Sequence, residues 1–152
     1  MTHTAQEIAD TLVARVPLPP LMPTQVYDDA LTNEITALAV PPGVKAGLFL
    51  LNDDLGRSHP LAQSLQGSPL GDYWHAIIHR REGDWNNARY WFGRVGQIPI
   101  LAQFYGADSE APDDFVERCR KVGTGHDAEL ERFQQDEMAQ LLMAAMKTDA
   151  PS

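Results

Sequence analysis

Apolar residues recur along this chain mainly at helical spacing. Near its start, Ile8, Leu12 and Val16 fall on one stripe, which is the pattern of an amphipathic helix over 4–16. The same spacing predicts several further helices. They are expected over 25–39, 43–54, 60–66, 71–82, 84–95, from the acidic segment 107–114 to Lys121, and over 127–147. The short apolar stretch 98–105 could be a helix or a strand.

Proline and short polar residues separate these helices. Four prolines in PLPPLMP, residues 17–23, predict an extended connector, because proline fixes φ and cannot continue a helix. Thr24 and Ser58 are the expected N-caps of the helices that follow them. A short side chain with an oxygen atom can accept hydrogen bonds from the free N–H groups of a first helical turn.

Two consecutive predicted helices, joined by Gly83 and Asp84, are expected to form a hairpin. Gly83 is the expected left-handed end of the first helix, because glycine adopts a positive φ without strain. Asp84 is the expected N-cap of the second helix. Ala76 and Ala88 are the small residues at which the two helices should approach each other most closely.

Strand signals are weak throughout the chain. No stretch of five or more residues alternates apolar and polar side chains with enrichment in β-branched residues, and no Asn-Gly or Asp-Gly hairpin signal occurs. We therefore expect an all-α protein, a compact bundle of about seven to nine helices. It should form a single domain over 1–147, followed by a frayed tail at 148–152.

The composition narrows the class of protein. The chain has 152 residues, a formal net charge of −9 and one cysteine, Cys119. The negative charge argues against nonspecific binding to nucleic acid or to anionic membranes. A single cysteine excludes an internal disulfide framework and a zinc site built from several cysteines. No apolar run is long enough to span a membrane, and the first residues lack the basic start and apolar core of a signal peptide, so a cytoplasmic location is expected.

The segment 71–99 differs from the rest of the chain. It contains all three tryptophans, Trp74, Trp85 and Trp91, and four of the twelve basic residues. Large aromatic residues at helical spacing usually belong to a hydrophobic core. They also line ligand pockets, so this segment is the first place to look for a site.

Part of this segment resembles a known repeat. In EGDWNNARYWFGRVGQIP, Gly83 lies at the turn, the small Ala88 is followed four residues later by Phe92, and Pro99 closes the unit, as in the second half of a tetratricopeptide repeat. The longer string HAIIHRREGDWNNARYWFGRVG is similar to the motif of a small family of uncharacterised proteins. These resemblances imply one repeat-like hairpin, over 71–95, inside a helical protein, and they imply no activity.

Two histidines provide the first candidate chemistry. His75 and His79 are four residues apart, so a helix places both on one side, which is the spacing of helical zinc and other transition-metal sites. Glu82 lies near the same direction, although the chain lacks the glutamate next to the first histidine that a zinc protease uses. Further ligands for a divalent metal ion would come from Asp53, Asp54 or His59. The alternative is that both histidines are hydrogen-bonded structural residues.

Four arginines of the same segment, Arg80, Arg81, Arg89 and Arg94, could bind an anion such as a phosphate or a carboxylate. Internal pairing is the favoured alternative, because a buried arginine in an acidic chain needs a carboxylate. The expected partners are Asp84 for Arg80, Glu82 for Arg81, and Asp53 with Asp54 for Arg89. A ligand site on this segment would use Trp74, His75, His79, Arg81, Glu82, Arg89 and Trp91.

Two classes of function fit these features. The first is a noncatalytic helical module that binds a protein partner or a second copy of itself. The apolar stretch LLMAAM at 141–146 favours a homodimer through the C-terminal helix. The alternative is a small enzyme, or a ligand- or metal-binding protein, with a site around His75, His79 and Glu82. No catalytic constellation is complete in the sequence, so the first class is the default expectation.

Overall fold

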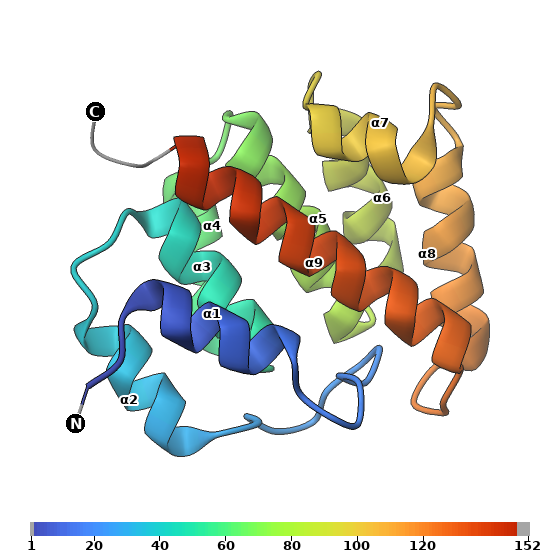
Figure 1. Cartoon of the computed structure of the whole chain (residues 1–152). Helices are drawn as coiled ribbons and strands as arrows, with labels where there is room; N and C mark the ends of the chain where they lie inside the picture. Colours follow the sequence, from blue (N-terminus) through green and yellow to red (C-terminus); the bar gives the residue numbers. More distant parts are fainter. Residues whose placement is uncertain (1, 149–152) are drawn as a thin grey trace.

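The computed structural model describes residues 2–148, and every regular element in that part of the chain is a helix (Figure 1). The helices are α1 (Ala5–Val13), α2 (Asp29–Ala37), α3 (Pro42–Leu51), α4 (Leu55–Ser64), α5 (Pro69–Glu82), α6 (Trp85–Arg94), α7 (Pro99–Tyr105), α8 (Ala111–Val122) and α9 (Ala128–Thr148). The all-α class is therefore confirmed. Of the predicted tail, Thr148 ends α9 and the rest lies outside the described residues. Among the described helices, none combines the length and the apolar character needed to cross a bilayer.

Two helices begin at other residues than the sequence suggested. α2 is capped by Asp28 and not by Thr24. α4 starts earlier than predicted because Asp54 caps it. Ser58 therefore lies inside α4, where its hydroxyl donates to the Ala46 carbonyl oxygen at 2.7 Å. In both helices an aspartate carboxylate accepts the capping hydrogen bond from the first turn. The predicted caps, Thr24 and Ser58, do not occupy these positions.

The uncertain stretch 98–105 is helical. α7 starts at Pro99, where proline suits a first helical turn because its missing N–H is not needed there. The predicted connector 17–23 contains no helix, as expected, and its Leu21 is buried. The chain thus alternates short helices with connectors that still contribute to the core.

The turn between α5 and α6 has the predicted form. Gly83 has φ 81° and ψ 18°, the left-handed region that glycine adopts without strain. The Asp84 N–H donates back to the His79 carbonyl oxygen at 2.9 Å, which closes the last turn of α5. Ala76 and Ala88 are both fully buried, as expected at a close contact between two helices.

α9 runs across the molecule and connects its two halves (Figure 1). It packs on α1, α3 and α7. Gln135 donates to the carbonyl oxygens of Leu12 and Val13, at 3.3 and 3.2 Å. Gln134 donates to the carbonyl oxygen of Pro20, at 3.4 Å. The C-terminal helix is thereby bound to the first helix and to the connector that follows it.

The apolar stretch LLMAAM lies near the end of α9 and mostly faces the interior. Leu141, Leu142 and Ala145 are buried, whereas Met143 is 49% exposed. The stretch therefore packs largely against its own chain. The width of its apolar face does not by itself require a second subunit.

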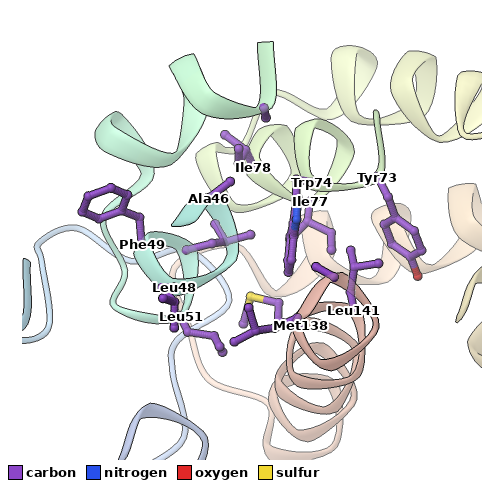
Figure 2. Packing of buried hydrophobic residues seen from close by; sticks show 14 of the residues in the cluster. Ala46, Leu48, Phe49, Leu51, Tyr73, Trp74, Ile77, Ile78, Met138 and Leu141 are labelled. Carbon is purple, nitrogen blue, oxygen red and sulfur yellow. The ribbon is translucent and has the colours of Figure 1, made fainter. Parts of the chain in front are cut away.

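α3 and α5 approach each other closely in the core. Trp74 is fully buried between α3 and α9 (Figure 2), and its indole N–H donates to the Gly43 carbonyl oxygen at 3.0 Å. A Cβ atom at Gly47 would lie 2.6 Å from the Trp74 ring and 3.1 Å from Leu142. The absence of a side chain at Gly47 therefore allows the two helices to approach, and it fixes α5 in the centre of the fold.

Candidate functional site

Two histidines and two arginines of α5 are nearly inaccessible to solvent. His75 and His79 are 3% and 7% exposed, and Arg80 and Arg81 are each 1% exposed. Burying such groups is unfavourable unless new partners replace the lost water. The partners of these residues therefore help to distinguish a structural role from a functional one.

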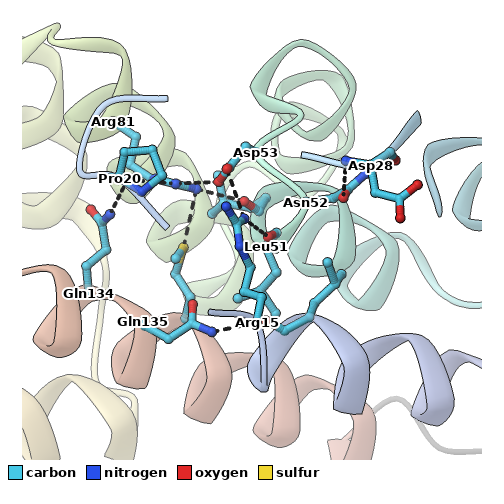
Figure 3. Close-up of polar contacts among 12 residues, drawn as sticks. Arg15, Pro20, Asp28, Leu51, Asn52, Asp53, Arg81, Gln134 and Gln135 are labelled. Carbon is cyan, nitrogen blue, oxygen red and sulfur yellow. Dashed lines mark hydrogen bonds and ion pairs between the residues drawn. The ribbon is translucent and has the colours of Figure 1, made fainter. Parts of the chain in front are cut away.

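Arg81 is neutralised by Asp53, and Arg15 shares the same carboxylate (Figure 3). Arg81 Nη2 lies 2.7 Å from Asp53 Oδ1, and Arg15 Nη1 lies 2.9 Å from Asp53 Oδ2. Arg81 also donates to the carbonyl oxygens of Leu50 and Pro20, at 2.7 and 3.0 Å. The predicted site residues Asp53 and Arg81 are thus engaged with each other and not with the histidines.

Arg80 lies in a second buried cluster, built on Glu137 of α9. Arg80 Nη2 lies 2.8 Å from Glu137 Oε1, and the hydroxyls of Tyr73 and Tyr105 donate to Glu137 Oε2 at 2.7 and 2.6 Å. Burial and the Glu137 charge raise the pKa of both tyrosines well above the usual range, so both hydroxyls remain proton donors. This cluster is closed by its own hydrogen bonds, which is typical of a structural network.

Three of the four arginines pair internally, but with other partners than predicted, whereas the exposed Arg94 lies over the Tyr90 ring. Arg80 pairs with Glu137, Arg81 with Asp53, and Arg89 with Glu117 of α8, at 3.0 Å. All three acids lie far from their partners in the sequence, so helix packing brings them together and local spacing does not. Trp74, another predicted site residue, belongs to the core described above.

The histidines of α5 meet a third one, His59 of α4. Nε2 of His59 lies 2.9 Å from Nε2 of His75, and the ring centroids of the three imidazoles are 4.8, 4.9 and 5.2 Å apart. One ligand nitrogen from each ring can be chosen so that all three lie within 4.8 Å of one another. The structure thus brings together the three histidines predicted as metal ligands, His59, His75 and His79.

Two carboxylates lie beside this cluster, at the turn between α5 and α6. Nδ1 of His79 is 3.5 Å from Glu82 Oε2 and 3.5 Å from Asp84 Oδ2. Glu82 Oε1 also lies 4.0 Å from Nδ1 of His59. Glu82 is therefore the predicted acid that reaches the histidines, whereas Asp54 caps α4 and pairs with Arg57.

Trp91 of α6 covers one side of the cluster. Its ring stacks on His75 with a centroid distance of 4.0 Å and an interplanar angle of 20°. His75 in turn stacks on His79, at 4.9 Å and 21°. The three rings form a continuous stack, which fixes the orientation of His75 and limits the access of water to it.

The surroundings of His75 favour its neutral form. Burial, and then the neighbouring His79 and His59, lower the pKa of His75 to about 4. A neutral imidazole keeps a free lone pair on one ring nitrogen. Within residues 2–148, neither Nδ1 of His75 nor Nδ1 of His79 has a hydrogen-bond partner. The surrounding side chains therefore do not replace all of the hydrogen bonds that these two rings would form with water.

One side of the site is open to solvent. The side chain of His59 is 29% exposed, that of Glu82 is 34% exposed and that of Asp84 is 44% exposed. Sequence reasoning assigned Asp84 to the helix cap and left it out of the site. Helical spacing gives no signal for its approach to His79, because Gly83 ends the helix between them.

Three imidazoles with adjacent carboxylates form a ligand set suited to zinc, copper or nickel. Among the described residues, the polar side-chain contacts of these histidines are with one another and with Glu82 and Asp84. No protein-family model, no curated protein and no solved structure matches the chain.

Proposed function

We propose that this protein binds one divalent transition-metal ion through His59, His75 and His79. The observation that carries the proposal is the convergence of imidazoles from two neighbouring helices, with three ligand nitrogens within 4.8 Å of one another. An ion with bonds of about 2.0–2.1 Å to nitrogen holds tetrahedral ligands about 3.3 Å apart. Binding would therefore have to shorten the widest of these spacings, which is at most 4.8 Å.

The chemistry of the ligands selects the class of ion. Imidazole nitrogens favour zinc, copper and nickel, whereas magnesium and calcium prefer oxygen ligands. The pKa of His75, about 4, means that metal binding at neutral pH displaces no proton from its ligand nitrogen. Three protein ligands leave a fourth position of a tetrahedral ion for water or a small molecule. The partly exposed His59 gives that position access to solvent.

The interaction module has less support in the fold. It relied on the wide apolar face of the C-terminal helix, and Leu141 and Leu142 of that face are buried in their own chain. The metal proposal instead accounts for buried imidazoles whose ring nitrogens are not all paired within the described chain.

Titration of the chelator-treated protein with Zn²⁺ tests the proposal, with binding heat and retained zinc as readouts. We expect one ion per chain, and loss of binding in His59→Ala and His79→Ala. His3→Ala and His126→Ala are matched controls, because these two histidines pair with Glu34 and Glu131 outside the cluster. The controls should bind zinc like the wild type. Absence of zinc binding, or an equal loss in the controls, would contradict the proposal.

A further inference from the structure

Asp54 and Asp84 occupy equivalent positions, each directly before the first residue of a helix. Their backbone angles are nearly the same, with φ −100° and ψ 74° at Asp54 and φ −94° and ψ 75° at Asp84. The Asp54 carboxylate accepts from the backbone N–H of Arg57, at 3.2 Å. The Asp84 carboxylate accepts from no backbone N–H of α6 within the described chain. The backbone at Asp84 therefore permits a cap, and the side chain is directed elsewhere.

The Asp84 carboxylate points toward the histidine cluster. Its Oδ2 lies 3.5 Å from Nδ1 of His79 and accepts a hydrogen bond from Asn87 Nδ2 at 2.7 Å. Glu82, on the other side of the turn, approaches the same Nδ1 to 3.5 Å. Two acids from one turn thus face a buried ring nitrogen that has no hydrogen bond in residues 2–148.

We propose that Asp84, held by Asn87, is a positioning residue for the metal site, an inference that rests on the proposed metal-binding function. On metal binding its carboxylate accepts the Nδ1 proton of His79, with Glu82 as a second acceptor, which requires the present 3.5 Å contacts to shorten or realign into hydrogen bonds. This fixes the tautomer in which Nε2 is the free ligand nitrogen. Histidine ligands of metal sites commonly donate their other N–H to a carboxylate, which orients the ring and makes it a stronger ligand. Because the Asp84 side chain is directed to His79, it does not cap α6.

The same geometry argues against a second ion at the turn. His79, Glu82 and Asp84 also form a group whose ligand atoms lie within 4.8 Å of one another. A neutral imidazole has a lone pair on only one ring nitrogen, so His79 would have to lose both of its protons to serve two ions. One ion therefore binds per chain, and the two acids remain outside its coordination sphere.

Two matched variants separate helix capping from metal positioning. Asp84→Ser removes the charge but keeps a side chain that caps helices well, and Asp54→Ser makes the same change at the other cap. Asp84→Ser should weaken zinc binding by about 10–100-fold without lowering the melting temperature, because the serine is free to cap α6. Asp54→Ser should lower the melting temperature, because it removes the buried carboxylate oxygen that accepts from Thr32 and pairs with Arg57, and it should leave the zinc affinity unchanged.

The tautomer of His79 provides a readout that a purely structural role would not change. Nitrogen-15 chemical shifts of the zinc-loaded wild type should show a protonated Nδ1 and a metal-bound Nε2 at His79. Asn87→Ala, which keeps Asp84 but removes its donor, should weaken zinc binding less than Asp84→Ser does. A metal-bound Nδ1 at His79 would overturn the proposal, and an unchanged affinity in Asn87→Ala would overturn the part assigned to Asn87.

The zinc titrations distinguish this inference from the function on which it rests. If the wild type binds no zinc, both are overturned. One ion bound with equal affinity in the wild type and in Asp84→Ser overturns the positioning role and leaves the metal site intact. Two ions in the wild type, one of them lost in Asp84→Ser, would make Asp84 a ligand and overturn the positioning role as well.

Discussion

The arginine clusters and the histidine cluster are both buried on α5, but they differ in how the chain offsets the free-energy cost of burying their polar groups. Arg80 and Arg81 each lie within 2.8 Å of a buried carboxylate. In the histidine cluster, the shortest contact joins two imidazoles, His59 and His75, at 2.9 Å. The carboxylates nearest to His79 lie 3.5 Å away and belong to partly exposed side chains. The chain neutralises its buried arginines and leaves its buried histidines open to an added ligand.

This difference follows from the chemistry of the two side chains. A guanidinium stays charged at every physiological pH, so its burial requires an acid that is equally buried. An imidazole can be buried in its neutral form and then retains a lone pair. Buried carboxylate partners therefore identify the arginine clusters as structural, although Nε of Arg15 and Nε of Arg81 also lack a hydrogen bond in the described chain. The convergence of three imidazoles, without a buried acid among residues 2–148 to pair them, identifies the histidine cluster as the candidate site.

The largest expected effect comes from breaking an arginine cluster. Glu137→Gln removes the charge that neutralises Arg80, and both side chains are almost completely buried. We expect the free energy of unfolding to fall by about 3–5 kcal/mol, because an unpaired charge then remains in the core. Urea denaturation followed by circular dichroism measures this change.

A surface ion pair provides the control for this variant. The Glu129 side chain is 84% exposed, and its contact with Arg118 is 3.8 Å long. Glu129→Gln should leave the free energy of unfolding nearly unchanged, because water screens such pairs. Equal stability of Glu137→Gln and the wild type would show that the Arg80 cluster does not have the structural role inferred for it.

Acid should destabilise the fold through the histidine cluster. Burial and the two other histidines lower the pKa of His75 to about 4 in the folded protein, whereas an unfolded histidine has a pKa of about 6.5. Between these values the unfolded state binds a proton that the folded state does not bind. The free energy of unfolding should therefore fall as the pH is lowered from about 6.5 to about 4.

Urea titrations at several pH values test this dependence. His75→Gln removes the titrating group and should reduce the slope of stability against pH. His126→Gln is the control, because the side chain of His126 is 81% exposed. The same slope in His75→Gln as in the wild type would assign the acid sensitivity to other groups.

The smallest expected effect is spectroscopic. Cu²⁺ bound at the cluster should quench the fluorescence of Trp91, because its ring stacks on His75 at 4.0 Å. Trp91→Phe keeps an aromatic ring over His75, so it should lose much of this quenching while copper affinity changes little. Trp85→Phe is the control and should lose less of it. Equal quenching in the two variants would place the ion away from the cluster.

The local part of this fold could be predicted from the sequence. Amphipathic spacing gave the helical class, and Gly83 gave the turn, because both signals depend on residues close together in the chain. The start of α4 was missed, since Asp54 and Ser58 are both good acceptors and only their three-dimensional positions decide which one caps the helix.

The site could be predicted only in part. His75 and His79 follow from their spacing, and His59 was among the proposed ligands. Asp53 was also proposed, but it follows α3 with φ 59°, a turn conformation that amphipathic spacing does not reveal, and it pairs with Arg81. Asp84 was missed because its position predicts a cap. A side chain that departs from its local preference can be recognised only once its neighbours are known.

The hydrogen bonds from α9 to the start of the chain have a consequence for the order of folding. Gln134 reaches Pro20 across 114 residues of sequence, and Gln135 reaches Leu12 across 123. Closing loops of this length costs more chain entropy than forming a helix or a hairpin, so such contacts form late. Interactions that form after the folding transition state act mainly on the unfolding rate. The docking of α9 therefore contributes chiefly to the lifetime of the folded protein, and little to the speed at which it folds.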